Sequence, residues 1–274
     1  MAQVMEREVD QTTLVHYEAR DGVAILTLDD PPANTYTYEL MQDLDRCILR
    51  ARMDDSVHVI VLTGAGEKFF CAGASIPMLN SVTPTFKYYF CLHANETLNR
   101  LEQTPKLVIA ALNGHTVGGG LEIAMAADMR IARRGGGKIG LPEVNLGVLP
   151  GTGGTQRLCR IVGKSSAIEL MVTGRTFEFD EAKTMGIVTD VYDAGNRDEF
   201  MTKVMEYAKQ FTPPNMASKA IGNIKRAVQS GAEIPFQDAL AIERELQQQL
   251  FASQDAKEGI GAYVEKRKAQ FKAL

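Results

Sequence analysis

The stretch GHTVGGGLEIAMAAD, residues 114–128, joins three consecutive glycines to an apolar run that contains a single carboxylate, Glu122. Glycine costs about 0.5–1 kcal/mol relative to alanine inside a helix, and a buried acid without a partner costs more. We therefore expect another group to approach the backbone of residues 118–120 closely, and the chemistry of the protein to use the acid.

The rest of the N-terminal two thirds alternates short apolar runs with amphipathic segments. The expected strands, each ended by turn residues, cover residues 22–30, 57–66, 106–114, 129–132 and 186–192. The expected helices cover residues 36–53, 85–103, 117–127 and about 152–158. This alternation predicts an α/β fold.

After about residue 195 the pattern changes to helices alone. Four amphipathic helices are expected over residues 198–210, 217–230, 236–252 and 255–272. We therefore divide the chain into a core, residues 1–197, and a helical C-terminal region, residues 198–274. The apolar faces of these helices are expected to pack on the core or on another subunit.

Composition excludes several classes of function. The 274 residues carry a formal net charge of −4, which does not favour a nucleic-acid or anionic-membrane partner. No apolar run is long enough to span a membrane, and the N-terminal MAQVMEREVDQTT is not apolar like a signal peptide. The four scattered cysteines, Cys47, Cys71, Cys91 and Cys159, make a metal site improbable and favour reduced thiols, hence a cytoplasmic location.

Generic glycine motifs do not account for the glycine-rich segments. A phosphate-binding loop needs a lysine after its last glycine, and GVLPGTGGT at 147–155 has none. No segment supplies a dinucleotide fingerprint after a strand, and AGASIP at 72–77 lacks the second glycine of a nucleophile elbow. A phosphate-binding loop and a serine hydrolase site are therefore not favoured.

Two segments could instead present free backbone N–H groups. FFCAGAS at 69–75 is built of small residues after a strand, and VGGGLE at 117–122 is a glycine-rich helix start. Together they could form an oxyanion hole, although each alone is also explained as a tight packed turn.

The second feature is a pair of acids. Glu122 lies among apolar residues in a first helical turn, and Glu143 follows Pro142. Each alone could simply complement a helix dipole, but burial of Glu122 would raise its pKa and suit it to proton transfer. Two acids beside an oxyanion hole indicate proton transfer next to a carbonyl. Paired glycosidase acids are the weaker reading, because the chain has no tryptophan.

These segments together resemble the crotonase (enoyl-CoA hydratase/isomerase) superfamily over nearly the whole chain. The segments that carry the resemblance, in order, are AILTLDDPPANTYTYELMQDL, VIVLTGAGEKFFCAGASI, VIAALNGHTVGGGLEIAMAADMRIA, GLPEVNLGVLPGTGGTQRLCRIVG, ELMVTGRTFEFDEAKTMGIVTDVY and EGIGAYVEKRKAQF. The resemblance implies a spiral of β-β-α units with a C-terminal helical trimerisation region. It also implies a homotrimer or dimer of trimers that binds an acyl-CoA thioester, with no cofactor because coenzyme A is part of the substrate.

The resemblance also implies roles for single residues. The amides of Ala74 and Gly119 match the oxyanion hole, Glu122 and Glu143 match the two acids of the hydratases, and Gly151 matches the residue that helps to place the catalytic water. The remaining candidates for contacts with the substrate or its CoA are Ala33, Ala72, Ile76, Gly118, Pro142 and, toward a neighbouring subunit's nucleotide, Tyr263, Lys266 and Phe271.

The implied reaction adds water across the C2–C3 double bond of a 2-enoyl-CoA, with Glu122 as the base and Glu143 as the acid. An isomerase is the nearest alternative, and having both acids favours hydration. A hydrolase, a decarboxylase or a ring-forming synthase of the same fold also stays open. RNA binding is a remote alternative, because the arginines of RCILRARMDD at 46–55 are followed by two aspartates.

Three segments depart from the expected family pattern. Ser75 stands where an acid is usual, which keeps a turn-capping hydroxyl but loses a charge. Glu143 lies one position further from Glu122 than expected, and the glycines of residues 133–138 should absorb the extra length. The aromatic segment SIPMLNSVTPTFKYYF, residues 75–90, predicts a branched, cyclic or otherwise bulky acyl group, unless its aromatics are helix-core residues.

Overall fold

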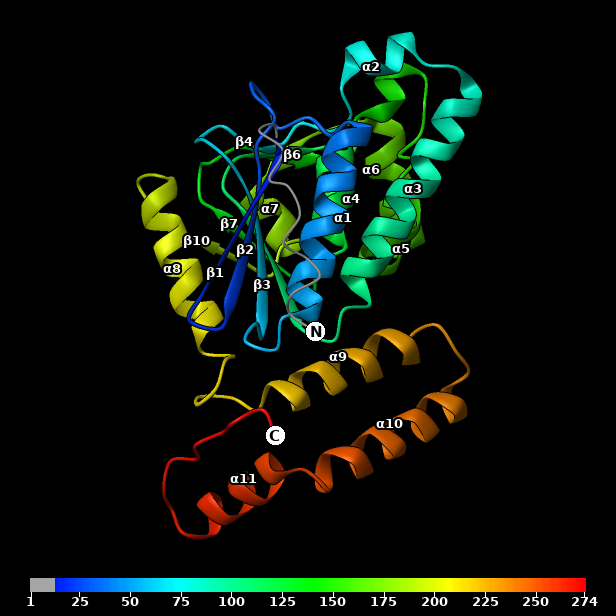
Figure 1. Ribbon diagram of the computed structural model, residues 1–274. Coiled ribbons are helices and arrows are strands. Elements are labelled where there is room, and N and C mark those ends of the chain that lie inside the picture. Colours follow the sequence, from blue (N-terminus) through cyan, green and yellow to red (C-terminus); the bar gives the residue numbers. More distant parts are fainter. Residues whose placement is uncertain (1–12) are drawn as a thin grey trace.

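The computed structural model describes residues 13–274, so most of the N-terminal stretch considered above lies outside the described residues. Within these residues ten strands form two sheets, with the orders β1-β2-β3-β5-β7-β10 and β4-β6-β8-β9 (Figure 1). The strands are β1 Val15–Arg20, β2 Val23–Leu28, β3 Val59–Gly64, β4 Phe69–Cys71, β5 Leu107–Leu112, β6 His115–Val117, β7 Met129–Arg133, β8 Lys138–Gly140, β9 Phe177–Glu178 and β10 Asp190–Tyr192.

Helices cover both faces of the larger sheet and form the C-terminal end of the chain (Figure 1). They are α1 Tyr38–Met53, α2 Ile76–Ser81, α3 Pro84–Glu102, α4 Gly119–Met125, α5 Gly154–Val162, α6 Lys164–Thr173, α7 Phe179–Thr184, α8 Arg197–Lys209, α9 Ser218–Gly231, α10 Phe236–Phe251 and α11 Gln254–Val264. None of these helices combines the length and apolarity needed to cross a membrane.

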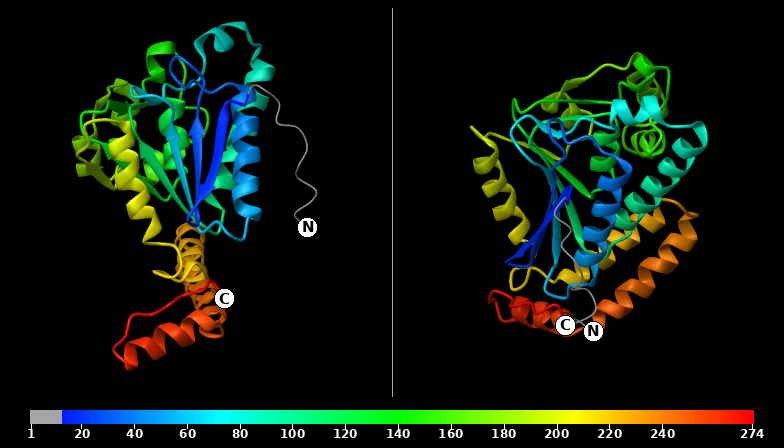
Figure 2. Two further views of the ribbon diagram at one scale, coloured as in Figure 1. Left: turned by 60° about the vertical axis from the view of Figure 1, so that its left-hand side comes forward. Right: turned by 45° about the horizontal axis from the view of Figure 1, so that its top comes forward.

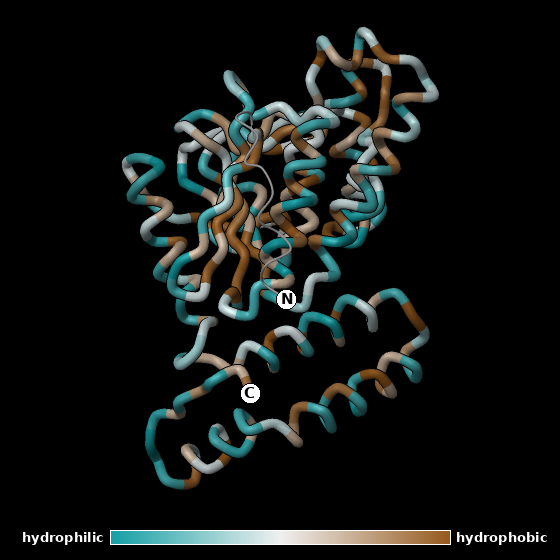
Figure 3. Tube along the Cα trace, in the orientation of Figure 1, coloured by the Kyte–Doolittle hydropathy of each residue, from teal (hydrophilic) through white to brown (hydrophobic). Residues whose placement is uncertain are grey.

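Side chains of the larger sheet alternate between two cores. Along β2, Leu26 and Leu28 pack toward α1 and α3, whereas Val23 and Ile25 pack with Phe200 of α8. Because both faces are buried, these strands consist of continuous apolar runs, and their interiors are the most hydrophobic part of the chain (Figure 3). This is why β2, β3, β5 and β7 were predicted, whereas β1, most of whose residues are exposed, was not among the expected strands.

The smaller sheet lies at the ends of strands of the larger one. The chain passes from β3 to β4, from β5 to β6 and from β7 to β8, and β4, β6 and β8 are parallel neighbours. The corners stack tightly: a Cβ atom on Gly64 would lie 2.4 Å from the carbonyl oxygen of Phe69, and one on Gly114 would lie 2.3 Å from the carbonyl oxygen of Lys68. The chain therefore repeats a β-β-helix unit turn upon turn, which confirms the expected α/β spiral.

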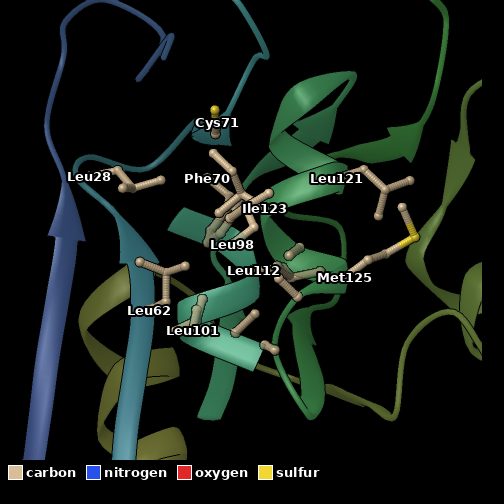
Figure 4. Packing of buried hydrophobic residues seen from close by; sticks show 14 of the residues in the cluster. Leu28, Leu62, Phe70, Cys71, Leu98, Leu101, Leu112, Leu121, Ile123 and Met125 are labelled. Carbon is tan, nitrogen blue, oxygen red and sulfur yellow. The ribbon is translucent and has the colours of Figure 1, made fainter. Parts of the chain in front are cut away.

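The core under the smaller sheet joins successive turns of this spiral. Figure 4 shows Phe70 of β4, Ile123 of α4 and Leu98 of α3 meeting there, and all three are buried. Helix α4 is consequently buried along its whole length. Its first turn, which begins at Gly119, is thus held at a fixed place against β4.

The C-terminal helices differ from the rest of the molecule. Helices α9, α10 and α11 extend away from the sheets as an arm (Figure 2), whereas α8 packs on the larger sheet. The expected division between residues 197 and 198 stays a prediction, and the packing places α8 with the core. The helix predicted for residues 255–272 is shorter than expected and ends at Val264, because Lys266 has a φ of 56° and the Asp255 carboxylate accepts hydrogen bonds from the amides of Lys272 and Ala273.

Candidate active site

The candidate residues follow the carboxyl ends of three parallel strands. Ala74 comes after β4, Gly119 after β6 and Glu143 after β8. Since these strands are neighbours in one sheet, their ends lie side by side. Ligands commonly bind at the carboxyl ends of parallel strands.

The amide of Ala74 faces away from the segment that pairs with it. Tyr36 donates to the carbonyl of Gly73 at 3.0 Å, and Ser75 donates to the carbonyl of Tyr36 at 3.3 Å. In such an extended pairing the intervening N–H, that of Ala74, points to the opposite side. A Cβ atom on Gly73 would lie 3.1 Å from the amide nitrogen of Gly119, so the two segments are in contact.

Gly119 is required by the packing of a neighbouring side chain. A Cβ atom there would lie 1.9 Å from Cε1 of Tyr36, so the Tyr36 ring fills the space. The close approach to residues 118–120 that the sequence indicated is therefore made at Gly119 by a protein side chain. Within residues 13–274, the amides of Ala74 and Gly119 donate to no protein acceptor.

Glu122 is buried and held by three donors. Its Oε1 accepts from the amides of Thr152 and Gly154, each at 2.7 Å, and its Oε2 accepts from the hydroxyl of Thr152. Burial raises the pKa of the Glu122 carboxyl above its ordinary value, and the hydrogen bonds from Thr152 and Gly154 limit that rise. The second donor, Gly154, is the first residue of α5, so that helix holds the acid at its N-terminus.

Glu143 has a contrasting environment. It opens a short 3-10 turn, Glu143–Leu146, and its Oε1 lies 3.1 Å from the position that a Cβ atom on Gly118 would take. Its Oε2 is buried without a hydrogen-bond partner among residues 13–274. Burial, with a smaller contribution from the charge of Glu122, raises the pKa of Glu143 to about 7. Such an oxygen requires a water molecule or a ligand.

The other residues next to the two acids frame the same place. Gly118 caps α4 with a φ of 56°, and Pro142 precedes the 3-10 turn. A Cβ atom on Gly151 would lie 3.1 Å from Sγ of Cys91. Within the described residues the Gly151 amide donates to no protein acceptor. It therefore remains a prediction that this amide holds a water.

The proposed CoA-contacting residues divide into two groups. The amide of Ala72 donates to the carbonyl of Ala33 at 3.1 Å, and Ile76 begins α2 with an exposed side chain, so these three lie near Ala74. In the tail, the side chain of Tyr263 is exposed, and the Phe271 ring packs against Gly259 within its own chain. Contacts of Tyr263, Lys266 and Phe271 with a neighbouring subunit stay a prediction.

The departures from the family pattern are accommodated locally. Ser75 caps α2 by accepting from the amide of Met78, as its hydroxyl suggested. Between β7 and β8, Gly135 turns with a φ of 66° and no atom lies within 4 Å of a Cβ placed on it; that this segment absorbs the extra length before Glu143 stays a prediction. Among the α3 aromatics Phe90 is buried in the core, whereas Tyr89 is 62% exposed.

Tyr36, Thr152 and Lys87 were not singled out from the sequence. Tyr36 stacks on Phe90 with ring centroids 5.5 Å apart, and its hydroxyl lies 3.4 Å from that of Thr152. The charge of Lys87 acts on both acids and moderates the raised pKa of each. The one signal available for Thr152 was a polar residue between glycines in PGTGG.

Comparison with known proteins finds similar chains along nearly the whole length of this one. A family model described as enoyl-CoA hydratase/isomerase matches residues 18–273. The chain is 37% identical over 253 residues to a probable enoyl-CoA hydratase of Bacillus subtilis, covering 91% of this chain and 95% of that one. It is 37% identical over 254 residues to a short-chain-enoyl-CoA hydratase of Clostridium acetobutylicum, with coverage of 92% and 95%.

A solved structure shares the fold. The crystal structure of an enoyl-CoA hydratase from Geobacillus kaustophilus HTA426 superposes with a TM-score of 0.92 and 42% identity. The match covers 97% of this chain and 98% of that one.

Proposed function

Since the chain belongs to the enoyl-CoA hydratase/isomerase family, we propose that it adds water across the C2–C3 double bond of a 2-enoyl-CoA thioester. The observation that carries the proposal is a pair of acids with contrasting hydrogen bonding: Glu122 is buried and hydrogen-bonded at both oxygens, whereas Glu143 is half-buried with one buried oxygen that has no partner among the described residues. Glu122 has three donors that favour its ionised form, whereas Glu143 has an unpartnered oxygen and a pKa raised to about 7.

The reaction follows from these environments. The thioester oxygen accepts from the amides of Ala74 and Gly119, which makes C3 electrophilic; losing one such donor typically costs about 3 kcal/mol of transition-state stabilisation. Ionised Glu122 takes a proton from a water, which the Gly151 amide helps to place, and the resulting hydroxide bonds to C3. Protonated Glu143 delivers its proton to C2. One water is consumed, and the two acids exchange their protonation states until a proton passes back between them.

A direct assay tests the reaction. Incubation with crotonyl-CoA should bleach the ultraviolet absorbance of the enoyl thioester, and the Glu122→Gln/Glu143→Gln double variant should not. A rise of absorbance from a 3-enoyl-CoA without hydration would indicate the isomerase instead. Release of free thiol would indicate a hydrolase, and either result would overturn the proposal.

The acyl group is the finer part of the proposal. Phe86, Tyr88 and Tyr89 of α3 expose aromatic surface, while Phe90 stacks on Tyr36 behind the oxyanion hole. We propose that this aromatic surface accommodates a branched, cyclic or otherwise bulky acyl group. A panel of straight, branched and cyclic enoyl-CoA thioesters, compared by kcat/KM, tests this; a clear preference for the straight short chain would contradict it.

The assembly is a separate part of the proposal. Apolar side chains on the C-terminal arm face solvent in the single chain; they are Ile224, Val228, Phe236, Phe251, Ile260 and Val264. A groove of about 810 Å³ between α9 and α10 is lined partly by Ile224, Val228 and Phe251. These surfaces support a homotrimer or a dimer of trimers, and light scattering should give three or six times the 30.0 kDa chain mass. A monomer would contradict it.

A further inference from the structure

The two oxygens of Glu122 are not equivalent. A carboxylate oxygen offers two lone-pair sites, and on Oε1 both are taken, by the amides of Thr152 and Gly154. On Oε2 one is taken by the Thr152 hydroxyl, so one remains free. A water molecule or a transferred proton can therefore be received at Oε2 alone.

The direction of the hydrogen bonds at Oε2 follows from chemistry. An ionised carboxylate only accepts, so the Thr152 hydroxyl must donate to it. The Thr152 oxygen is then free to accept from the hydroxyl of Tyr36, 3.4 Å away. Burial raises the pKa of Tyr36 well above its ordinary value, so this hydroxyl keeps its proton.

The three side chains have little freedom to rearrange. Tyr36 is 3% exposed, and Thr152 and Glu122 are each 1% exposed. The Tyr36 ring is fixed between Phe90, on which it stacks, and Gly119, against whose backbone it packs. The order Tyr36–Thr152–Glu122 is thus set by packing across segments that are far apart in the sequence.

We propose that Thr152 and Tyr36 are positioning residues for the general base. The Thr152 hydroxyl directs the free site of Oε2 toward the attacking water and lowers the proton affinity of that oxygen, and Tyr36 fixes the orientation of the Thr152 hydroxyl. This inference rests on the proposed hydration reaction. A second measurement, which needs no substrate, tests the positioning role even if the hydration reaction is wrong.

The first test is the pH profile of hydration in Thr152→Ala and Thr152→Val. Without the donor the ionised form of Glu122 is less favoured, so the acid limb of kcat should move up by about one pH unit. Below this limb the rate should fall by up to about tenfold, whereas above it the rate should stay close to that of the parent. Thr152→Ser should restore the profile, and Thr155→Ala, a matched loss of a hydroxyl in α5, should leave it unchanged. A uniform loss of rate with an unmoved acid limb would overturn the proposal.

Tyr36→Phe should shift the same limb in the same direction by a smaller amount, about 0.3 pH unit, because it acts through Thr152. Added to Thr152→Ala it should produce no further shift. Tyr38→Phe, which removes a hydroxyl from a neighbouring tyrosine, is the matched control and should shift nothing. If the shifts of the acid limb in the Tyr36 and Thr152 variants added up in the double variant, Tyr36 would not act through Thr152.

The second readout is the thermal midpoint of unfolding between about pH 5 and pH 9. In the parent background Thr152→Ala should destabilise more at high pH, where Glu122 is ionised and loses its donor. In the Glu122→Gln background the loss should be the same at every pH. Equal pH dependence in both backgrounds would show that the hydroxyl does not interact with the charge, whatever reaction the enzyme catalyses.

Discussion

The surroundings of Glu122 and Glu143 differ more than the closeness of the two acids suggests. Both follow neighbouring strands of the same small sheet, through α4 and through a 3-10 turn. Glu122 is enclosed by packed residues and has a donor for each oxygen, whereas Glu143 precedes a loop whose Val144, Leu146 and Leu149 are exposed. The carboxylate of Glu122 is thus held by the protein itself, whereas Oε2 of Glu143 has no partner among the described residues.

This difference teaches how one fold can give the same side chain two environments. Burial raises the pKa of both carboxyls, but three donors limit the rise for Glu122, whereas the pKa of Glu143 reaches about 7. In the proposed reaction, neighbours rather than residue type therefore distinguish the base from the acid.

The largest expected effect comes from removing either acid. Glu122→Gln and Glu143→Gln should each lower kcat for hydration by about 10²–10⁴-fold, since a proton-transfer group typically contributes that much. Steady-state assays with crotonyl-CoA measure this, and binding of CoA itself, followed by calorimetry, should survive in both. Activity of Glu143→Gln within tenfold of the parent would break the two-acid scheme.

A smaller loss is expected from Gly119→Ala. Its Cβ atom would lie 1.9 Å from Cε1 of Tyr36, so either the ring or the Gly119 amide must move. Displacing one oxyanion donor typically costs about 10²–10³-fold in kcat. Gly261→Ala, where nothing lies within 4 Å of the added atom, is the control and should keep full activity. A fully active Gly119→Ala variant would mean that the Tyr36 ring can move aside and leave the Gly119 amide in place.

The smallest effect concerns stability and distinguishes the two acids directly. The pKa of Glu143 rises from 4.5 to about 7 in the folded chain, so between these values the native state binds more protons than the unfolded state. Stability should therefore fall as pH rises through that window, by at most about 3 kcal/mol.

Glu143→Gln lacks this titration, so its thermal midpoint should exceed that of the parent near pH 8 and match it more closely near pH 5. Scanning calorimetry at the two pH values measures the difference. A Glu143→Gln gain that is equal at both would place the Glu143 carboxyl in an ordinary solvated environment.

Most of the larger sheet could be predicted because its strands are buried on both faces and therefore read as apolar runs. Strands β4, β6 and β8 could not, because each has three residues and no periodic pattern. Their corner glycines, Gly64 and Gly114, were the available signal, and its meaning depends on contacts with another turn of the spiral.

For the candidate site, the sequence indicated both acids and both glycine-rich segments through local composition. It did not indicate Tyr36, whose hydroxyl meets Thr152 across 116 positions. Nothing in the local pattern of PPANTYTYELM marks that residue as different from a helix-capping neighbour. Such a contact forms only when the spiral brings the segment after β2, which carries Tyr36, beside the loop before α5, which carries Thr152.

The tight packing between successive turns of the spiral has a consequence for engineering insertions into this protein. Because Ala74, Gly119 and Glu143 are each located by the strand that precedes it, the contour length of chain between them is free to vary. The turn at Gly135 opens to empty space, and a foreign peptide inserted there would lengthen the connection while β7 and β8 stay paired in their own sheets. We therefore expect that a peptide inserted at Gly135 leaves β7, β8 and the proposed activity unchanged.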